Sequence, residues 1–492
     1  MRAVALALVL VAGDARAELR PRYGGTVEAT LLGAPASLDP VQVRSHAEAT
    51  AVGLVFDTLY HVAVDGTVSP HLAVAAPVFD EKRTTARVEL RKGVVFSDGT
   101  AVSAQDVAAS LERARTGVKW LAPVITGVRV DGEAIEIALA APTAELPALL
   151  ALPQFSVTKA GKSPGARAIG SGPFQVDALD VARHRLGLRA FDGHFAGRPY
   201  VDRLELRWYD TADGEARRFE TGNAHLSSRG VSAFAGGQPT FTSHDVAGPT
   251  VLLVYLGFGA AHGAITRDPG FRRAVDLALA RGGLSSIGSG ERVVPTRLPI
   301  PVEAGAPPLD AAGKTGDLSA AQLELAIAAK RVPELAPAKR PALRLEILVE
   351  DTRPDDKEIA ERVGLALDKL GIAWTISAVT AQVMRDRVAK GTNDLYIGQL
   401  AELVAAPSSL WGAAFAAGND DWPLASLQTA SLDPAAATKA FDDREPIVPL
   451  LFRSVRLWYR SDVHGLAFDN LGRPCFADLY LFGTPVPTKA RP

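Results

Sequence analysis

The sequence predicts an α/β protein with more than one domain. Segments with the alternating pattern of strands are interspersed with helix-like segments along most of the 492 residues. This alternation is typical of layered α/β folds with largely parallel sheets. The hydrophobic content of 47% and the charged content of 22% are ordinary for a globular protein. At roughly 150 residues per domain, the length corresponds to about three domain-sized units.

The N-terminal residues 1–17 are predicted to be a cleavable secretory signal peptide. Arg2 precedes the apolar run Ala3–Ala12, which is too short to span a bilayer, and Ala15–Ala17 has the A-x-A pattern of a cleavage site. A buried N-terminal helix is the alternative interpretation. The single cysteine, Cys475, lies far from the cleavage site. We therefore expect no lipid anchor, no internal disulfide bond and a secreted or periplasmic protein.

The strongest local signals lie between residues 87 and 113. A strand is predicted over Arg87–Leu90, and the short apolar run Val94–Phe96 ends at the turn Asp98-Gly99. Ser103 has the position of a helix N-cap, with Asp106 three residues later, and a helix is expected to follow through Ala114.

Elements with recognisable periodicity occur before and after this segment. They are a strand over Tyr23–Thr30, a helix over Ala47–Tyr60, a hairpin over Val128–Leu139, a strand through Asp202–Leu206, a strand over Val251–Gly257, a helix over Pro269–Ala280, a strand over Leu343–Glu350, a helix over Pro354–Leu370 that ends at Gly371, and strands over Ala373–Val379, Asn393–Leu400, Arg444–Phe452 and Leu457–Arg460. Residues 301–342 are rich in Pro, Ala and Gly, which predicts a loop or linker with one helix near Ser319–Lys330.

Enzyme and metal motifs are absent from the sequence. H-E-x-x-H, C-x-x-C and G-x-S-x-G do not occur. The nine histidines are scattered. His61 and His71, and likewise His184 and His194, are spaced to fit neither one helix face nor a hairpin metal site, and each is expected to face solvent. The sequence thus predicts no catalytic residue, no metal site and no cofactor. The net charge of −2 without a basic stripe excludes nucleic acid as an expected partner.

The segment from Arg87 to Arg113 resembles the "strand, R-K-G-V-x-F-x-D-G-T-x-x-x-A-x-D-V, helix" signature of the family 5 extracellular solute-binding proteins. These proteins, cluster C of the periplasmic binding proteins, feed peptides, nickel chelates and related solutes to ABC importers. Other segments resemble family motifs in the same order: Ser37–Pro40, Val68–Ala73, Ala168–Phe174, Phe191–Tyr200, Phe271–Ala280 and Glu445–Leu450.

The resemblance implies a two-lobe periplasmic-binding-protein fold of type II, with an extra subdomain in lobe I. The implied division is a signal peptide over 1–17, lobe I over 18–258 with a subdomain at about 55–185, lobe II over 259–446, and a return to lobe I over 447–492. The chain is expected to cross between the lobes near Leu256–Ala261 and near Ile447–Trp458. Such a protein closes around a small solute by a hinge motion, as a monomer, and delivers it to the transmembrane subunits of an ABC permease.

The solute is expected to lie between the lobes, against three segments of the chain and two aromatic side chains. The candidate ligand-binding residues are Ser37, Asp39, Trp120, Gln154, Phe155, Gly398, Gln399, Leu400, Glu402 and Trp411. Either tryptophan could belong to the core instead.

One departure from the family pattern bears on the solute. Peptide-binding relatives carry G-W-x-x-D where this chain has Gly398–Glu402, and the Asp of that motif pairs with the α-amino group of the peptide. Unless Glu402 takes this role, a charged amino group would lack a buried counter-charge, so an ordinary peptide ligand is disfavoured. Two alternatives to an importer receptor stay open: a diverged sensor or adaptor of the same fold, and a secreted hydrolase with a dispersed catalytic triad.

Overall fold

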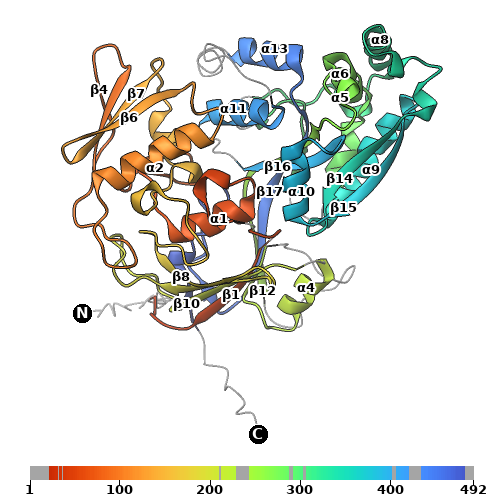
Figure 1. The fold of residues 1–492 in the computed structure, drawn as a ribbon. Coiled ribbons are helices and arrows are strands. Elements are labelled where there is room, and N and C mark those ends of the chain that lie inside the picture. Colours follow the sequence, from red (N-terminus) through yellow and green to blue (C-terminus); the bar gives the residue numbers. More distant parts are fainter. Residues whose placement is uncertain are drawn as a thin grey trace, which may run out of the picture.

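The computed structural model describes residues 21–31, 33–35, 37–209, 212–228, 243–287, 292–302, 306–401, 406–419 and 434–482. Figure 1 shows two lobes joined by two long strands, β12 (Ser243–Phe258) and β17 (Val448–Arg460). The predicted signal peptide, residues 1–17, lies outside the described ranges. None of the helices in these ranges combines the length and the hydropathy that a membrane span would need.

One sheet runs through both lobes. In spatial order its strands are β15 (Ala373–Val379), β14 (Arg344–Glu350), β16 (Leu395–Ala401), β12, β17, β11 (Leu226–Ser227), β1 (Thr26–Thr30), β10 (Arg203–Arg207), β9 (Arg185–Ala190) and β8 (Phe174–Asp180), and β13 (Val293–Pro295) pairs with β17. The sheet is mixed rather than largely parallel, because β12 and β17 are antiparallel to each other and β12 is antiparallel to β16.

The strands β12 and β17 carry the chain between the lobes. At one end of β12, Ser243–Ala247 pairs with the part of β17 that also pairs with β11 in lobe I. At the other end, Leu252–Phe258 pairs with β16 in lobe II. The register between β12 and β17 shifts on both sides of Thr250, so the ladder is irregular where the lobes meet.

Lobe I contains α1 (His46–Val55) and the strands β1 and β8 to β11. The helix predicted as far as Tyr60 ends five residues earlier, since Phe56 adopts an extended conformation and Tyr60 begins β2 (Tyr60–Val62). The first three residues of the motif Val68–Ala73 form the strand β3 (Val68–Pro70), which pairs with β2.

The subdomain of lobe I is a four-stranded antiparallel sheet with a helix packed on it. The strands, in spatial order, are β4 (Val78–Phe79), β5 (Thr85–Glu89), β7 (Ala134–Leu139) and β6 (Ile125–Asp131), and the helix is α2 (Ala104–Gly117). The capping box predicted from Ser103 and Asp106 is confirmed. Ser103 Oγ accepts from the Asp106 amide at 3.2 Å, and Asp106 Oδ2 accepts from the Ser103 amide at 2.9 Å.

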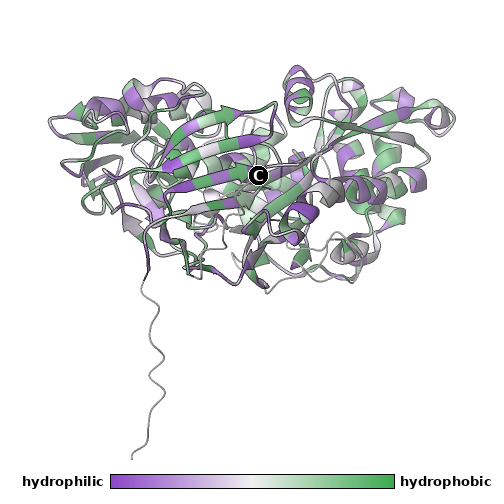
Figure 2. Cartoon of the chain, turned by 90° about the horizontal axis from the view of Figure 1, so that it is seen from below, coloured by the Kyte–Doolittle hydropathy of each residue, from purple (hydrophilic) through white to green (hydrophobic). Residues whose placement is uncertain are grey.

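Lobe II is built on the parallel strands β14, β15 and β16. Helices α6 (Pro269–Ala278), α8 (Leu318–Ala328) and α9 (Pro354–Lys369) belong to one side of the sheet, and α11 (Pro407–Ala417) and α13 (Pro434–Arg444) to the other, because the two sets contribute to different core clusters. Helix α10 (Ala381–Lys390) faces lobe I (Figure 1). Residues 301–342 hold a further short helix, α7 (Ala311–Thr315), beyond the single helix predicted there. Most helices show both colours in Figure 2, as expected for helices with one buried face.

Candidate functional site

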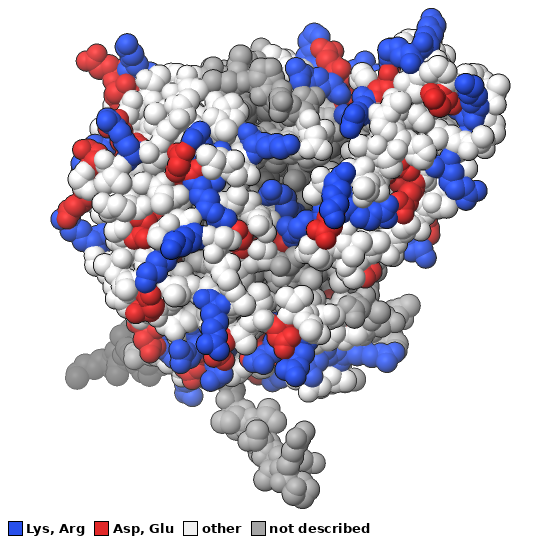
Figure 3. Space-filling view, in the orientation of Figure 1, with Lys and Arg blue, Asp and Glu red and all other residues white. Residues whose placement is uncertain are grey.

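The two lobes meet at the carboxyl ends of parallel strands. β1 is parallel to β10 in lobe I, and β14 is parallel to β16 in lobe II. The loop after β1 reaches the end of β14, since a Cβ atom on Gly33 would lie 3.3 Å from Glu350 Oε1. Ligands of open α/β sheets bind outside the carboxyl ends of the strands. Figure 3 shows that the surface is hollowed between the lobes, with Lys and Arg side chains around the recess.

We call this region the interlobe site. It is formed by the loop after β1, the 3₁₀ turns η1 (Pro40–Gln42) and η2 (Pro153–Phe155), α1, α10, and the carboxyl ends of β14 and β16. In lobe I, η1 lies beside η2, and α1 contacts both η2 and β16. The structure therefore brings together the three segments from which the sequence predicted ligand contacts.

Asp39 and Ser37 shape the loop after β1. The Asp39 carboxylate is paired with Arg113 and accepts hydrogen bonds from Ser163 Oγ at 2.6 Å and from the Val41 amide at 3.2 Å. Burial opposes ionisation of Asp39, but the bonds from Arg113 and Ser163 outweigh it and lower its pKa. Ser37 Oγ accepts from the Asp39 amide at 3.0 Å. All these partners belong to lobe I.

The η2 turn places Gln154 at the interlobe site. Gln154 is buried, and its Oε1 atom has no hydrogen-bond partner. The neighbouring Phe155 is fully buried and packs in the core of the subdomain. Phe155 thus supports the turn, whereas Gln154 offers a free acceptor.

The three predicted residues on β16 are divided between the two faces of the sheet, since neighbouring side chains on a strand point to opposite sides. Leu400 packs on the α11 side, and Gly398 shares that face. A Cβ atom on Gly398 would lie 2.2 Å from the ring of Tyr255 on β12, so the aromatic ring needs a glycine there. Gln399 points to the other face, where its Nε2 atom is buried without a hydrogen-bond partner. Glu402 lies outside the described ranges.

The two predicted tryptophans lie close together at a contact between the lobes. Trp120, from the subdomain, packs against α11, because a Cβ atom on Gly412 would lie 2.8 Å from its ring. The adjacent Trp411 is buried in the lobe II core and meets Phe441 edge to face, with ring centroids 5.6 Å apart. The Ser408 amide also donates to Glu145 of lobe I at 3.2 Å. Helix α11 is therefore seated on the subdomain.

An ion pair joins the lobes at the interlobe site. Arg385 on α10 is paired with Glu48 on α1 and also donates to the Gln42 carbonyl at 3.1 Å. The Glu48 side chain is only 1% exposed, and burial raises its pKa although Arg385 acts in the opposite direction. Glu48 Oε2 also accepts from the Arg44 amide at 2.8 Å, so Arg385 is the partner that lobe II contributes to this buried carboxyl group.

A second group of buried charges lies beside the carboxyl end of β14. Arg353 is paired with Glu350 and with Asp356, at 3.1 Å each. Asp356 is fully buried, and burial raises its pKa to about 6 against the opposing effect of Arg353 and Arg453.

Comparison with known proteins decides the family. The family model "Bacterial extracellular solute-binding proteins, family 5 Middle" matches residues 67–422. The chain belongs to this family.

Individual relatives agree with this assignment. The family 5 chain is 34% identical over 189 residues to the uncharacterized protein YhjP of Bacillus subtilis, covering 37% of this chain and 32% of YhjP. It is 24% identical over 287 residues to the glutathione-binding protein GsiB of Pectobacterium atrosepticum, covering 54% of each. The chain thus aligns with between a third and about half of the length of these relatives.

Solved structures confirm the predicted two-lobe fold. The periplasmic binding protein DppA of Helicobacter pylori, in complex with the peptide STSA, superimposes with a TM-score of 0.77. The match has 18% sequence identity and covers 94% of this chain and 99% of that chain. The family is one of extracellular solute-binding proteins, and no finding supports the hydrolase alternative.

Lobe I also has an open pocket of about 420 Å³ beside β8, β9 and β10, away from the interlobe site. Its arginines already have partners. Arg198 is paired with Asp192 and Asp202, and Arg189 donates to the Gln175 side chain at 3.0 Å. Arg203, which also lines the pocket, is paired with Asp177 at 3.4 Å, so two of the three lining arginines face carboxylates and Arg189 faces a neutral amide.

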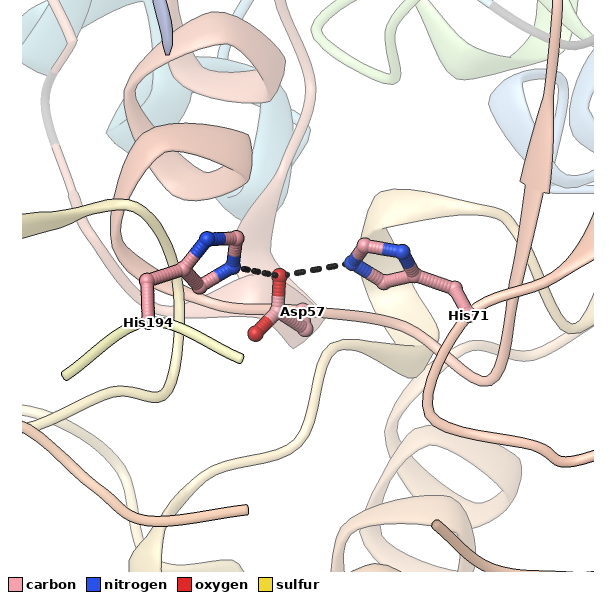
Figure 4. Close-up of side chains that lie close together, drawn as sticks. All are labelled: Asp57, His71 and His194. Carbon is pink, nitrogen blue, oxygen red and sulfur yellow. Dashed lines mark hydrogen bonds and ion pairs between the residues drawn. The ribbon is translucent and has the colours of Figure 1, made fainter. Parts of the chain in front are cut away.

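Sequence reasoning missed a group of three side chains in lobe I, Asp57, His71 and His194 (Figure 4). Asp57 Oδ1 lies 2.9 Å from His71 Nε2 and 3.5 Å from His194 Nε2. The expectation that the histidines face solvent is wrong for His194, whose side chain is 6% exposed. Burial alone would raise the pKa of Asp57. Contact with the two histidines outweighs this effect and holds the pKa well below its usual range. No sequence spacing signals this group, because its members come from separate segments.

Proposed function

We propose that this chain is a receptor that closes its two lobes around a small polar solute and passes the solute to an ABC permease. The observation that carries the proposal is a set of buried polar atoms without hydrogen-bond partners on the elements that form the interlobe site. They are Thr50 Oγ1 on α1, Gln154 Oε1 on η2, Arg385 Nε on α10 and Gln399 Nε2 on β16. Buried polar groups in folded proteins are almost always hydrogen-bonded, so a solute between the lobes would supply the partners.

The free atoms favour a solute with amide-like groups. Gln154 offers an acceptor and Gln399 offers a donor, and a peptide bond carries the complementary donor and acceptor. Two relatives are described as binding a peptide or glutathione, which supports a peptide-like solute. Three of the four atoms named above belong to neutral side chains, so recognition would depend on hydrogen bonds rather than on a carboxylate that pairs with an α-amino group.

Closure would take place about β12 and β17. The irregular ladder around Thr250 can absorb small backbone rotations, and the predicted lobe boundaries near residues 258 and 446 lie at the lobe II ends of these strands. The pair Glu48–Arg385 and the contact of Ser408 with Glu145 would form only when the lobes approach each other. A permease that contacts both lobes would then recognise the closed form.

The proposed setting is the periplasm, reached through the predicted signal peptide at 1–17. The receptor would act as a monomer without a cofactor and would leave its solute chemically unchanged. The family's extracellular location and its role in solute binding support this setting.

The direct test is native mass spectrometry of the full chain purified from periplasm without refolding. We expect a small molecule to co-purify and to be lost on unfolding. The variant Gln154→Leu/Gln399→Leu should lose it, because each missing hydrogen bond weakens binding by about tenfold. Gln322→Leu, at an exposed position on α8, is the matched control and should keep the molecule.

Two results would contradict the proposal. One is equal retention of the molecule by the double variant and the control. The other is a chemically altered product released from an added peptide, which would indicate an enzyme. A receptor that binds the solute but supports no uptake in cells that contain the cognate permease would instead be a sensor or adaptor.

A further inference from the structure

We propose that Asp57, His71 and His194 form a binding site for a divalent transition-metal ion within lobe I. The ligand atoms are Asp57 Oδ1 and the Nε2 atoms of the two histidines, which all lie within 4.8 Å of one another. Figure 4 shows both imidazole rings directed at the same carboxylate oxygen. This proposal is independent of the solute-binding function.

The hydrogen bond on the far side of His194 determines which ring atom faces the site. His194 Nδ1 lies 3.1 Å from the Gly197 carbonyl oxygen. A carbonyl can only accept, so Nδ1 carries the proton and donates it. The Nε2 atom of a neutral ring then presents a lone pair toward Asp57. Histidines that ligate metals usually donate their other N–H to a carbonyl or carboxylate in this way.

His71 Nε2 lies within ordinary hydrogen-bond distance of Asp57 Oδ1, at 2.9 Å, whereas the contact of His194 with the same oxygen leaves room for a shared cation. The distance of 3.5 Å from His194 Nε2 to Asp57 Oδ1 is long for a hydrogen bond. Ligand atoms of a tetrahedral zinc ion lie about 3.3 Å apart, given bond lengths near 2.0–2.1 Å. In addition, both rings converge on Oδ1, whereas Asp57 Oδ2 and His194 Nε2 are buried without hydrogen-bond partners. A carboxylate that served two hydrogen bonds would more easily use one oxygen for each ring.

The donor set indicates the class of metal. Two imidazole nitrogens and one carboxylate oxygen suit Zn²⁺ and its neighbours Co²⁺ and Ni²⁺, whereas Mg²⁺ and Ca²⁺ prefer oxygen ligands. Asp57 and His194 are 4% and 6% exposed, but His71 is 26% exposed. Water can therefore reach the metal beside His71 and complete its coordination.

A bound metal would connect two parts of lobe I. Asp57 follows α1 and His71 follows β3, both near the start of the subdomain, whereas His194 lies in the loop between β9 and β10 of the main sheet. The ring of Phe195 packs on both histidines, with centroids 4.8 Å and 4.9 Å away. The metal would hold the subdomain to the main sheet and so stabilise the folded chain.

The test uses the full chain freed of metal with EDTA, then titrated with Zn²⁺ in competition with a chromophoric chelator and, separately, with Co²⁺. We expect one ion per chain, a visible Co²⁺ spectrum and a rise in melting temperature. His71→Gln should weaken binding at least tenfold, and His71→Gln/His194→Gln should abolish it. If the double variant fails to fold, His71→Gln alone decides the question, since His71 is partly exposed.

The matched control is His262→Gln. His262 forms a His–Asp pair with Asp394 at 2.7 Å and, among the described residues, belongs to no group of three possible metal ligands. This variant should bind Zn²⁺ like the original chain. The proposal is overturned if the metal-free chain takes up no ion, if His71→Gln binds as tightly as the original, or if His262→Gln loses as much affinity. Unchanged Zn²⁺ binding by the double variant would place the ion elsewhere and also overturn it.

Discussion

At the residue scale, two buried carboxyl groups near the contact between the lobes have pKa values that depend strongly on their surroundings. Glu48 and Asp356 both have raised pKa values because burial disfavours the charged form, even though an arginine lies next to each. Sequence alone shows an ordinary Glu and an ordinary Asp at these positions. Their behaviour depends on how much water the folded chain removes from them.

Asp356 is expected to make stability depend on pH. Its pKa is about 6 in the folded chain against an ordinary value of 3.8, so the folded state holds a proton that the unfolded chain releases. The stabilising contribution is complete below pH 3.8 and is lost as the pH rises through 6. Relative to Asp356→Asn, the original chain should lose about 3 kcal/mol between pH 3.5 and pH 7, at 1.4 kcal/mol per pKa unit.

Urea unfolding of both proteins across this pH range measures the difference. Asp386→Asn, on the exposed side of α10, serves as the control. Its free energy of unfolding should change with pH in the same way as that of the original chain. A constant difference between Asp356→Asn and the original chain at every pH would refute the interpretation.

At the element scale, the capping box of α2 is a local sequence pattern whose contribution to the free energy of unfolding can be measured. Ser103→Ala removes the acceptor for the Asp106 amide and should lower the free energy of unfolding by about 1 kcal/mol. Ser319→Ala is a suitable control, because Asp317 rather than Ser319 caps α8. Thermal unfolding should show a clearly lower melting temperature only for Ser103→Ala. An equal decrease in both variants would contradict the stabilising role of the cap.

Elements whose signals are local were predicted well. The strand at Ala373–Val379 and the helix from Pro354 agree with β15 and α9 to within a residue, since periodicity and caps are properties of neighbouring residues. The helix from Ala47 was predicted too long, because its apolar spacing continues to Leu59, which the fold buries beyond the end of the helix. The two predicted strands at the C-terminal end are one strand, β17, whose length depends on pairing with β12.

At the scale of the whole molecule, the ion pair between Glu48 and Arg385 is expected to control closure. Arg385→Ala leaves Glu48 buried without its partner when the lobes are closed, a loss of several kcal/mol for a buried pair. When the lobes are open, water solvates Glu48 instead. We expect the variant to favour the open form, with a larger radius of gyration in small-angle X-ray scattering.

Arg387→Ala provides the control on the same helix. Arg387 is paired with Glu346 inside lobe II, so its loss should not change the scattering curve. If Arg385→Ala scatters like the original chain, the ion pair does not hold the lobes together.

By itself, the sequence determined the α/β class, the order of most elements and, through its motifs, membership of family 5. It also named Gln154 and Gln399 as candidate ligand contacts, and the fold buries one polar atom of each without a hydrogen-bond partner. The tertiary structure alone decided that Asp57, His71 and His194 meet, and that Glu48 faces Arg385 across the lobes. The physical reason is that helices and turns depend on neighbouring residues, whereas burial and charge pairing depend on which distant segments pack together.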